Sequence, residues 1–143
     1  MPDARGRIAA IDYGTKRVGV AVTDPLGLFP QPYGTFAPAE AVAALQQLQA
    51  DDGLRVIVVG WPLTADGEEG RATQRVQQYI NRLRNALGPV DLVKWDERYT
   101  TIEARERLHA TDRSKKRLHR RTHQGRVDEA AAGLMLQEFL NQR

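Results

Sequence analysis

The sequence predicts an α/β domain built on a five-stranded mixed sheet in the order 3-2-1-4-5, covered by flanking helices. Three observations predict it. The chain has 143 residues, enough for one domain and too few for two large ones. Two apolar segments near the start are separated by a tight turn, which is typical of an antiparallel hairpin. Two later apolar segments each follow a helical pattern, which is typical of parallel strands added beside the first strand.

The first part of the chain predicts three strands and a helix. Residues 8–11 and 18–22 are apolar and flank a tight turn at 13–16. A third strand is expected near 31–36, next to turns marked by Pro25, Gly27, Pro30 and Pro32. Pro38 then begins a helix. The apolar residues with helical spacing in it are Ala41, Val42, Leu45 and Leu48.

The second part of the chain predicts two more strands and three helices. The apolar run 56–59 is typical of a central strand buried on both faces. A helix ending before Gly88-Pro89 leads to a fifth strand at 90–95. Its apolar stripe is Val76, Tyr79, Ile80, Leu83 and Leu87. A short helix is expected at 101–108 and a last one at 127–140, all within a single domain of residues 1–143.

The composition excludes several classes of protein. There is no cysteine, so disulfides, cysteine-bound zinc and thiol nucleophiles are absent. No apolar stretch approaches the ~18 to 20 residues of a membrane span, and the first residues lack the apolar core of a signal peptide. We therefore expect a cytoplasmic protein without membrane contact.

The charge is unevenly distributed. Residues 109–126 hold seven basic residues and one acid, a net +6, whereas the rest holds 14 basic and 17 acidic residues, a net −3. A basic segment on a mildly acidic body favours a polyanionic partner, usually nucleic acid. The alternative is a solvated loop without a partner. We expect a basic loop at about 110–126, mobile when unbound. Its phosphate-contacting residues would include Lys115, Lys116, Arg117, Arg120 and Arg121.

Three carboxylates are expected to meet at one edge of this sheet. Asp12 ends the first strand and Glu97 follows the fifth, so both lie where the carboxyl ends of parallel strands form sites. Asp128 begins the apolar stripe of the last helix, whereas Glu129 points about 100° away. The stripe continues through Ala131, Ala132, Met135, Leu136, Phe139 and Leu140.

An acid on a packing face is costly unless it is neutralised. A divalent cation held by Asp12, Glu97 and Asp128 would do so, and an all-oxygen shell suits Mg²⁺ or Mn²⁺. Two such ions ~4 Å apart can support phosphodiester cleavage. The alternatives are a turn residue at Asp12, a Glu97–Arg98 pair, and a first-turn acid at Asp128.

Four motifs resemble those of the YqgF/RuvX family, in family order and over nearly the whole chain. They are Ile-Asp-Tyr-Gly-Thr-Lys-Arg-Val-Gly-Val-Ala-Val at 11–22, Val-Gly-Trp-Pro-Leu at 59–63 with Asp66-Gly67, Asp96-Glu97-Arg98 before Thr100-Thr101, and Val127-Asp128 with Ala130-Ala131. Two positions depart from the family pattern: Thr64 stands where asparagine is expected, and Tyr99 where leucine is usual.

This resemblance implies an RNase H-like fold, with Asp12, Glu97 and Asp128 at the positions of the family's acidic triad. It implies a bacterial cytoplasmic metal-dependent nuclease. The natural reaction would be processing of the 5′ end of pre-16S rRNA or, alternatively, resolution of Holliday junctions in recombination and repair. The sequence is compatible with a monomer or a homodimer, and a junction resolvase would usually need the symmetric dimer.

Several residues near the triad could help to bind nucleic acid, or could have structural roles alone. Gly14 permits a close turn, and Lys16, Arg17 and Arg98 could contact phosphates. For Arg17 a surface charge without function is an equal alternative. Trp61 could stack on a base, but a tryptophan beside a central strand is more often part of the core.

Two other classes of function compete with the nuclease. The segment 12–15 resembles the phosphate-binding hairpin of actin-like kinases and ATPases, although those proteins use two such domains. A non-catalytic nucleic-acid-binding adaptor would share the basic segment but would be expected to have a broken triad. All three acids are present here.

Overall fold

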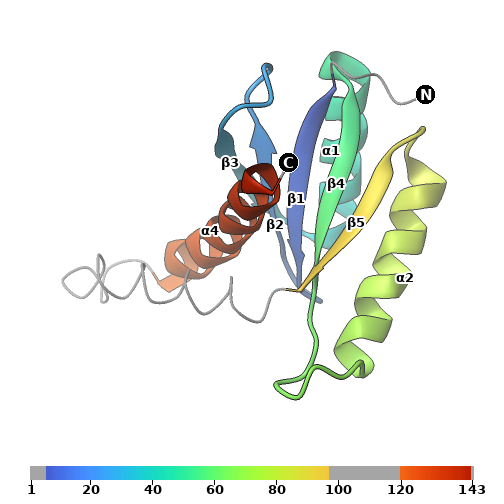
Figure 1. Cartoon of the computed structure of the whole chain (residues 1–143), viewed down its shortest axis with the longest axis vertical. Coiled ribbons are helices and arrows are strands. Elements are labelled where there is room, and N and C mark those ends of the chain that lie inside the picture. The colour runs from blue at the N-terminus through green and yellow to red at the C-terminus, as the bar shows by residue number, and fades with distance from the viewer. Residues whose placement is uncertain (1–5, 97–119, 143) are drawn as a thin grey trace.

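The computed structural model describes residues 6–96 and 120–142, with only the backbone described for 120–129 (Figure 1). Its five strands form one sheet in the order β3-β2-β1-β4-β5, which confirms the predicted order. The strands are β1 Arg7–Tyr13, β2 Val18–Thr23, β3 Pro30–Phe36, β4 Leu54–Trp61 and β5 Asp91–Asp96. β1 pairs antiparallel with β2 and parallel with β4, and β5 continues parallel beside β4.

The helices cover both faces of the sheet. α1 (Pro38–Asp52) and α2 (Arg71–Ala86) pack on one face, and α4 (Arg120–Asn141) crosses the other face over β1, β2 and β3 (Figure 1). The molecule therefore has three layers. Within the described residues, no helix is long and apolar enough to cross a membrane.

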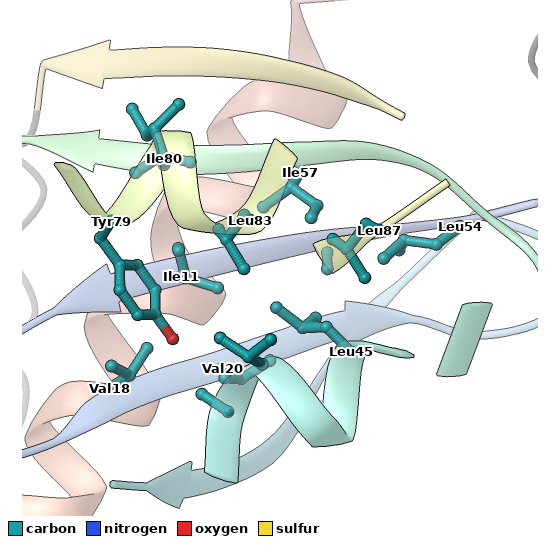
Figure 2. Close-up of a cluster of buried hydrophobic side chains, with 14 of the residues drawn as sticks. Ile11, Val18, Val20, Leu45, Leu54, Ile57, Tyr79, Ile80, Leu83 and Leu87 are labelled. Atoms are coloured by element: carbon teal, nitrogen blue, oxygen red, sulfur yellow. The ribbon is translucent and has the colours of Figure 1, made fainter. Parts of the chain in front are cut away.

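Strand alternation divides the core between the two faces. Ala9 and Ile11 of β1 join the cluster under α1 and α2, whereas Ile8 and Ala10 join the cluster under α4. Figure 2 shows the first cluster, in which Leu83 and other residues of α2 point toward the sheet. The predicted stripes of both helices are buried there: Ala41, Val42, Leu45 and Leu48 of α1, with Val76, Tyr79, Ile80, Leu83 and the adjoining Leu87.

β3 forms one edge of the sheet and includes Pro30 and Pro32. Proline has no N–H group to donate to a neighbouring strand, so it is tolerated in an edge strand, where one side has no strand to bond. The pairing register of β2 with β3 shifts between Val20 and Ala21. The strand predicted near 31–36 is therefore confirmed, and it begins one residue earlier.

The last helix is longer than the sequence predicts. α4 begins at Arg120, not at Val127, so Arg120 and Arg121 belong to its first turn and the expected loop at 110–126 is wrong for 120–126. The prediction of this helix rests on its apolar stripe, and that stripe starts at Val127. Arginine and glutamine favour a helix without contributing to such a stripe. The helix predicted at 101–108 lies outside the described residues.

Candidate active site

The carboxyl ends of the three parallel strands lie at one edge of the sheet. Ile11 of β1 is opposite Val59 of β4, and Trp61 of β4 is opposite Asp96 of β5. Asp12 follows Ile11 directly, so it lies level with the end of β4. The prediction that β1 and β5 end at the same edge is confirmed, at the point where the direction of winding reverses.

Asp12 projects from the face of the sheet that α4 covers. Its neighbours Ile11 and Tyr13 pack with the α1 and α2 cluster, and Ala10 packs with the α4 cluster. Side chains alternate along a strand, so Asp12 shares the face of Ala10. Asp12 is half-buried and has an interaction partner. The Asp12 side chain therefore faces the layer formed by α4, the helix to which Asp128 belongs.

Glycines occupy the positions beside Asp12 on both neighbouring strands. Gly19 of β2 pairs directly with Asp12. On β4, Gly60 follows Val59, the partner of Ile11, and both glycines are buried. Directly opposite residues of a sheet project from the same face. No side chain from β2 or β4 therefore fills the space next to the Asp12 carboxylate at this level.

The apolar face predicted for the last helix is confirmed from residue 131 onward. Ala131, Ala132, Met135 and Leu136 are buried against the sheet, and Phe139 and Leu140 pack at the margin of the same cluster. Asp128 lies in α4, three residues before Ala131, and the structure describes only its backbone. Small residues at 131 and 132 bring this part of the helix close to the strands.

The other predicted ligand, Glu97, lies outside the described residues together with Arg98, Lys115, Lys116 and Arg117. β5 is described up to Asp96, the residue before Glu97. Among the residues described, no three acids or histidines gather where they could hold a metal ion. Of the three predicted ligands, the structure thus describes the side chain of Asp12 alone.

The turn after β1 depends on glycine. The N–H of Gly14 donates to the carbonyl oxygen of Arg17 at 2.8 Å, and a Cβ on Gly14 would lie 2.8 Å from that same oxygen. This confirms the prediction that Gly14 permits a close turn. Lys16 and Arg17 are exposed at the tip, at the same edge as Asp12.

Trp61 is part of the core, as the structural alternative predicted. Its side chain is 8% exposed, and the Nζ atom of Lys94 lies 4.1 Å from the ring centroid. Thr64 orders the following loop, because its hydroxyl oxygen accepts from the N–H of Glu68 at 3.1 Å. The atypical threonine is thus accommodated as an acceptor for the loop backbone.

A pocket that the sequence patterns do not predict lies on the other side of the turn. It has a volume of about 220 Å³ and lies between the β1–β2 turn and the first turns of α2. Its lining comprises Tyr13, Gly14, Thr15, Pro62, Ala72, Arg75 and Val76. Among its described lining residues the only charged one is Arg75, which belongs to a group of arginines on one face of α2. The pattern of these charges around the helix is the sequence feature that indicates this surface.

The fold defines the class of protein. The structure is similar to T. thermophilus RuvC, solved in complex with a Holliday junction substrate, with a TM-score of 0.54 at 14% identity, covering 96% of each chain. This similarity confirms the RNase H-like fold.

Comparison of sequences then identifies the family. The model of the RuvX family, described as Holliday junction resolvase, matches residues 6–142. A Salinibacter ruber relative is 51% identical over 96% of this chain and 94% of its own length. A Chlorobaculum tepidum relative is 39% identical over 94% and 93%. Both carry the name "Putative pre-16S rRNA nuclease". The chain belongs to the RuvX family, and it is a nuclease that hydrolyses phosphodiester bonds.

Proposed function

We propose that this nuclease is a divalent-metal-dependent endonuclease that processes the 5′ end of pre-16S rRNA. The observation that carries the chemistry is Asp12, which lies at the carboxyl edge of the sheet on the α4 face, with a glycine on each side. The substrate is inferred from the names of relatives that match nearly the full chain. The proposal thus combines a local site with a near full-length similarity.

The metal would be held by Asp12, Glu97 and Asp128. Trp95, two residues before Glu97 in the sequence, lies on the α4 face, because its ring contacts Phe139 and its Nε1 donates to Glu138, both on α4. Asp128 precedes buried Ala131 by three residues and Met135 by seven, which is the spacing of one helix face.

The chemistry of these groups fits the proposed ion. All three are carboxylates, the donors that Mg²⁺ and Mn²⁺ prefer, and the glycines beside Asp12 leave space at its carboxylate. When bound, a pair of such ions would supply an activated water and charge stabilisation for the leaving oxygen. The remaining residues would bind and orient the phosphodiester backbone. These are Lys16, Arg17, Arg98, Lys115, Lys116, Arg117, Arg120 and Arg121.

A cleavage panel tests this proposal. The full chain is incubated with an RNA fragment spanning the 5′ end of 16S rRNA, a four-way DNA junction and simple duplexes, in Mg²⁺, in Mn²⁺ and in EDTA. We expect cleavage of the RNA fragment with either metal and none in EDTA. Asp12→Asn should lower cleavage at least about a hundredfold, because several kcal/mol of charge stabilisation are lost. Asp12→Asn activity within tenfold of wild type would exclude the metal assignment.

Resolution of Holliday junctions is the second candidate function. It is favoured by the description of the RuvX family model and by the similarity of the fold to RuvC. Paired cuts across a junction would require a homodimer, so symmetric cleavage of the four-way DNA by a dimer, with the RNA fragment left intact, would establish it instead. Tight binding of RNA or DNA without cleavage of any substrate would indicate a non-catalytic adaptor.

A further inference from the structure

α2 is a basic helix within the otherwise acidic part of the chain. Its sixteen residues include Arg71, Arg75, Arg82 and Arg84 and no aspartate or glutamate. Outside residues 109–126 the chain has a net charge of −3, so this helix reverses the local balance. Arginine is a favourable helix former, but this preference alone does not determine which face of α2 each arginine occupies.

Three of these arginines share one face of the helix. Arg71, Arg75 and Arg82 are separated by four and seven residues, which places them within about 40° of one another around the axis. All three are exposed, and Gln78 lies between them on the same face. The buried face is formed by Thr73, Val76, Tyr79, Ile80 and Leu83, several of which Figure 2 shows pointing into the core. We call Arg71, Arg75 and Arg82 the arginine face.

The fourth arginine points elsewhere. Arg84 is two residues from Arg82, which puts it roughly 160° away around the helix. It is also exposed. Arg84 therefore has the same charge, the same helix and the same access to solvent as Arg82, but it lies outside the arginine face.

The arginine face is not used for internal pairing. Among the residues that the structure describes, Arg71, Arg75 and Arg82 form no ion pair or side-chain hydrogen bond. The contacts of α2 with α1 are neutral: Tyr79 donates to the carbonyl of Pro38 at 2.8 Å, and Gln46 donates to that of Ala86 at 3.0 Å. The charge of the arginine face is therefore available to a partner.

The arginine face begins beside the turn that follows Asp12, on the opposite face of the sheet from the Asp12 side chain, and runs away from this turn. Arg75 lines the 220 Å³ pocket together with Tyr13, Gly14 and Thr15, the three residues that follow Asp12. Tyr79 supports the wall of this pocket, because its ring lies 4.6 Å from that of Tyr13. In Figure 1 the first turns of α2 lie at the same end of the molecule as the carboxyl ends of β1 and β4.

A second hollow continues along the same helix. It has a volume of about 580 Å³ and is lined by Gln78, Asn81, Arg82, Asn85 and Ala86. Arg71 and Arg82 are eleven residues apart, about 16 Å along the axis at ~1.5 Å per residue. At ~3.4 Å of rise per nucleotide, this length corresponds to about five nucleotides of one strand.

We infer that the arginine face of α2 binds the phosphate backbone of the substrate nucleic acid where the substrate extends past the β1–β2 turn from the candidate active site. Guanidinium groups bind phosphates through paired hydrogen bonds, and the amides of Gln78, Asn81 and Asn85 are additional donors. Contacts of this kind fix the position of the nucleic acid without reading its bases. The inference rests on the proposed function, because it assigns this surface to the substrate of the same site.

Salt dependence of binding tests the inference. Affinity of the full chain for the RNA fragment is measured in EDTA at several salt concentrations, for wild type, for Arg75→Gln with Arg82→Gln, and for Arg84→Gln. Each lost phosphate contact lowers the slope of log affinity against log salt by about 0.7 to 0.9. The double variant should therefore lose roughly 1.5 units of slope, and Arg84→Gln should keep the wild-type slope. Thermal unfolding should be nearly unchanged in both, because the side chains are exposed.

A lysine pair provides the conservative variant. Arg75→Lys with Arg82→Lys retains both charges and should restore most of the slope, because counterion release depends on charge.

An unchanged slope in the double glutamine variant would overturn the inference, and so would an equal loss in Arg84→Gln. In either case, cleavage by the wild-type chain leaves the proposed function standing. If wild type neither binds nor cleaves any substrate in the panel, the proposed function fails first. Binding of an acidic protein by this face, with the slope intact, would also overturn the inference.

Discussion

The two faces of the sheet are packed differently. The face under α1 and α2 is filled by large aliphatic side chains such as Ile11, Leu45 and Leu83. The cluster under α4 is smaller and combines three alanines with Ile8, Val58, Met135 and Leu136, and at the carboxyl edge of this face Asp12 lies between buried glycines. Large side chains contribute more burial free energy, whereas small ones leave space for a polar site. The first face mainly stabilises the fold, and the second contains the proposed metal site.

The largest expected effect is on activity, at the α4 face. Asp128→Asn should lower cleavage at least about a hundredfold, because it removes one of three charges proposed to hold the metal. Glu129→Gln, the neighbouring acid on α4, should retain activity within a few fold. Initial rates on the RNA fragment measure both. The opposite ranking of the two variants would show that Glu129, not Asp128, faces the site.

The next effect is on stability, at the other face. Leu83 is fully buried under α2, and Leu83→Ala should lower the free energy of unfolding by about 2 to 5 kcal/mol. Urea unfolding measures this loss. Cleavage per folded molecule should change little, because Leu83 packs on the side away from Asp12. A hundredfold loss of cleavage at full folding would break the division between the two faces.

A smaller effect is expected from filling the space beside Asp12. Gly60→Ala adds a methyl group on the Asp12 face and should lower cleavage about tenfold, which corresponds to an activation barrier raised by about 1.4 kcal/mol when the reacting groups are displaced. Gly133→Ala is the matched control on α4, because nothing lies within 4 Å of its added Cβ. That control should keep activity and stabilise the helix by up to about 1 kcal/mol. Equal activity in the two variants would mean that the space at Gly60 is not used.

The order of the strands could be predicted from the sequence because it follows from local patterns. The turn at 13–16 implies an antiparallel pair, and a helix between two apolar runs implies a parallel one. The edge where Asp12 and the end of β5 meet follows from that order. The beginning of α4 could not be predicted in the same way, because residues 120–126 have no apolar stripe.

Two features near the site could not be predicted from the sequence and depend on the three-dimensional structure. Gly19 and Gly60 are 7 and 48 residues from Asp12, and only the register of β1 with both neighbours places them beside it. The arginine face could not be predicted from the sequence for a different reason. A net charge counted by segment does not distinguish Arg82 from Arg84, although they lie on different sides of α2. The placement of Glu97 remains a prediction from the sequence.

The smallest effect concerns Tyr79, which joins the stabilising face to the pocket beside the turn. Burial raises its pKa from 10.0 to about 12, Tyr13 adds to the rise, and the positive charge of Arg82 opposes it. The folded chain thus holds the phenol proton of Tyr79 more tightly than the unfolded chain does. The contribution of this group to the free energy of unfolding is therefore fully present below pH 10 and is lost as the pH rises through 12.

Tyr79→Phe removes the hydrogen bond to Pro38 and should cost about 1 kcal/mol of unfolding free energy at pH 8. The difference from wild type should shrink between pH 10 and 12, because only wild type then loses the protonated phenol. Urea unfolding at pH 8, 10 and 11.5 measures it. Tyr33→Phe, on the exposed edge strand, should stay within ~0.5 kcal/mol of wild type at pH 8. A constant gap between Tyr79→Phe and wild type at all three pH values would show that the buried phenol does not couple to folding.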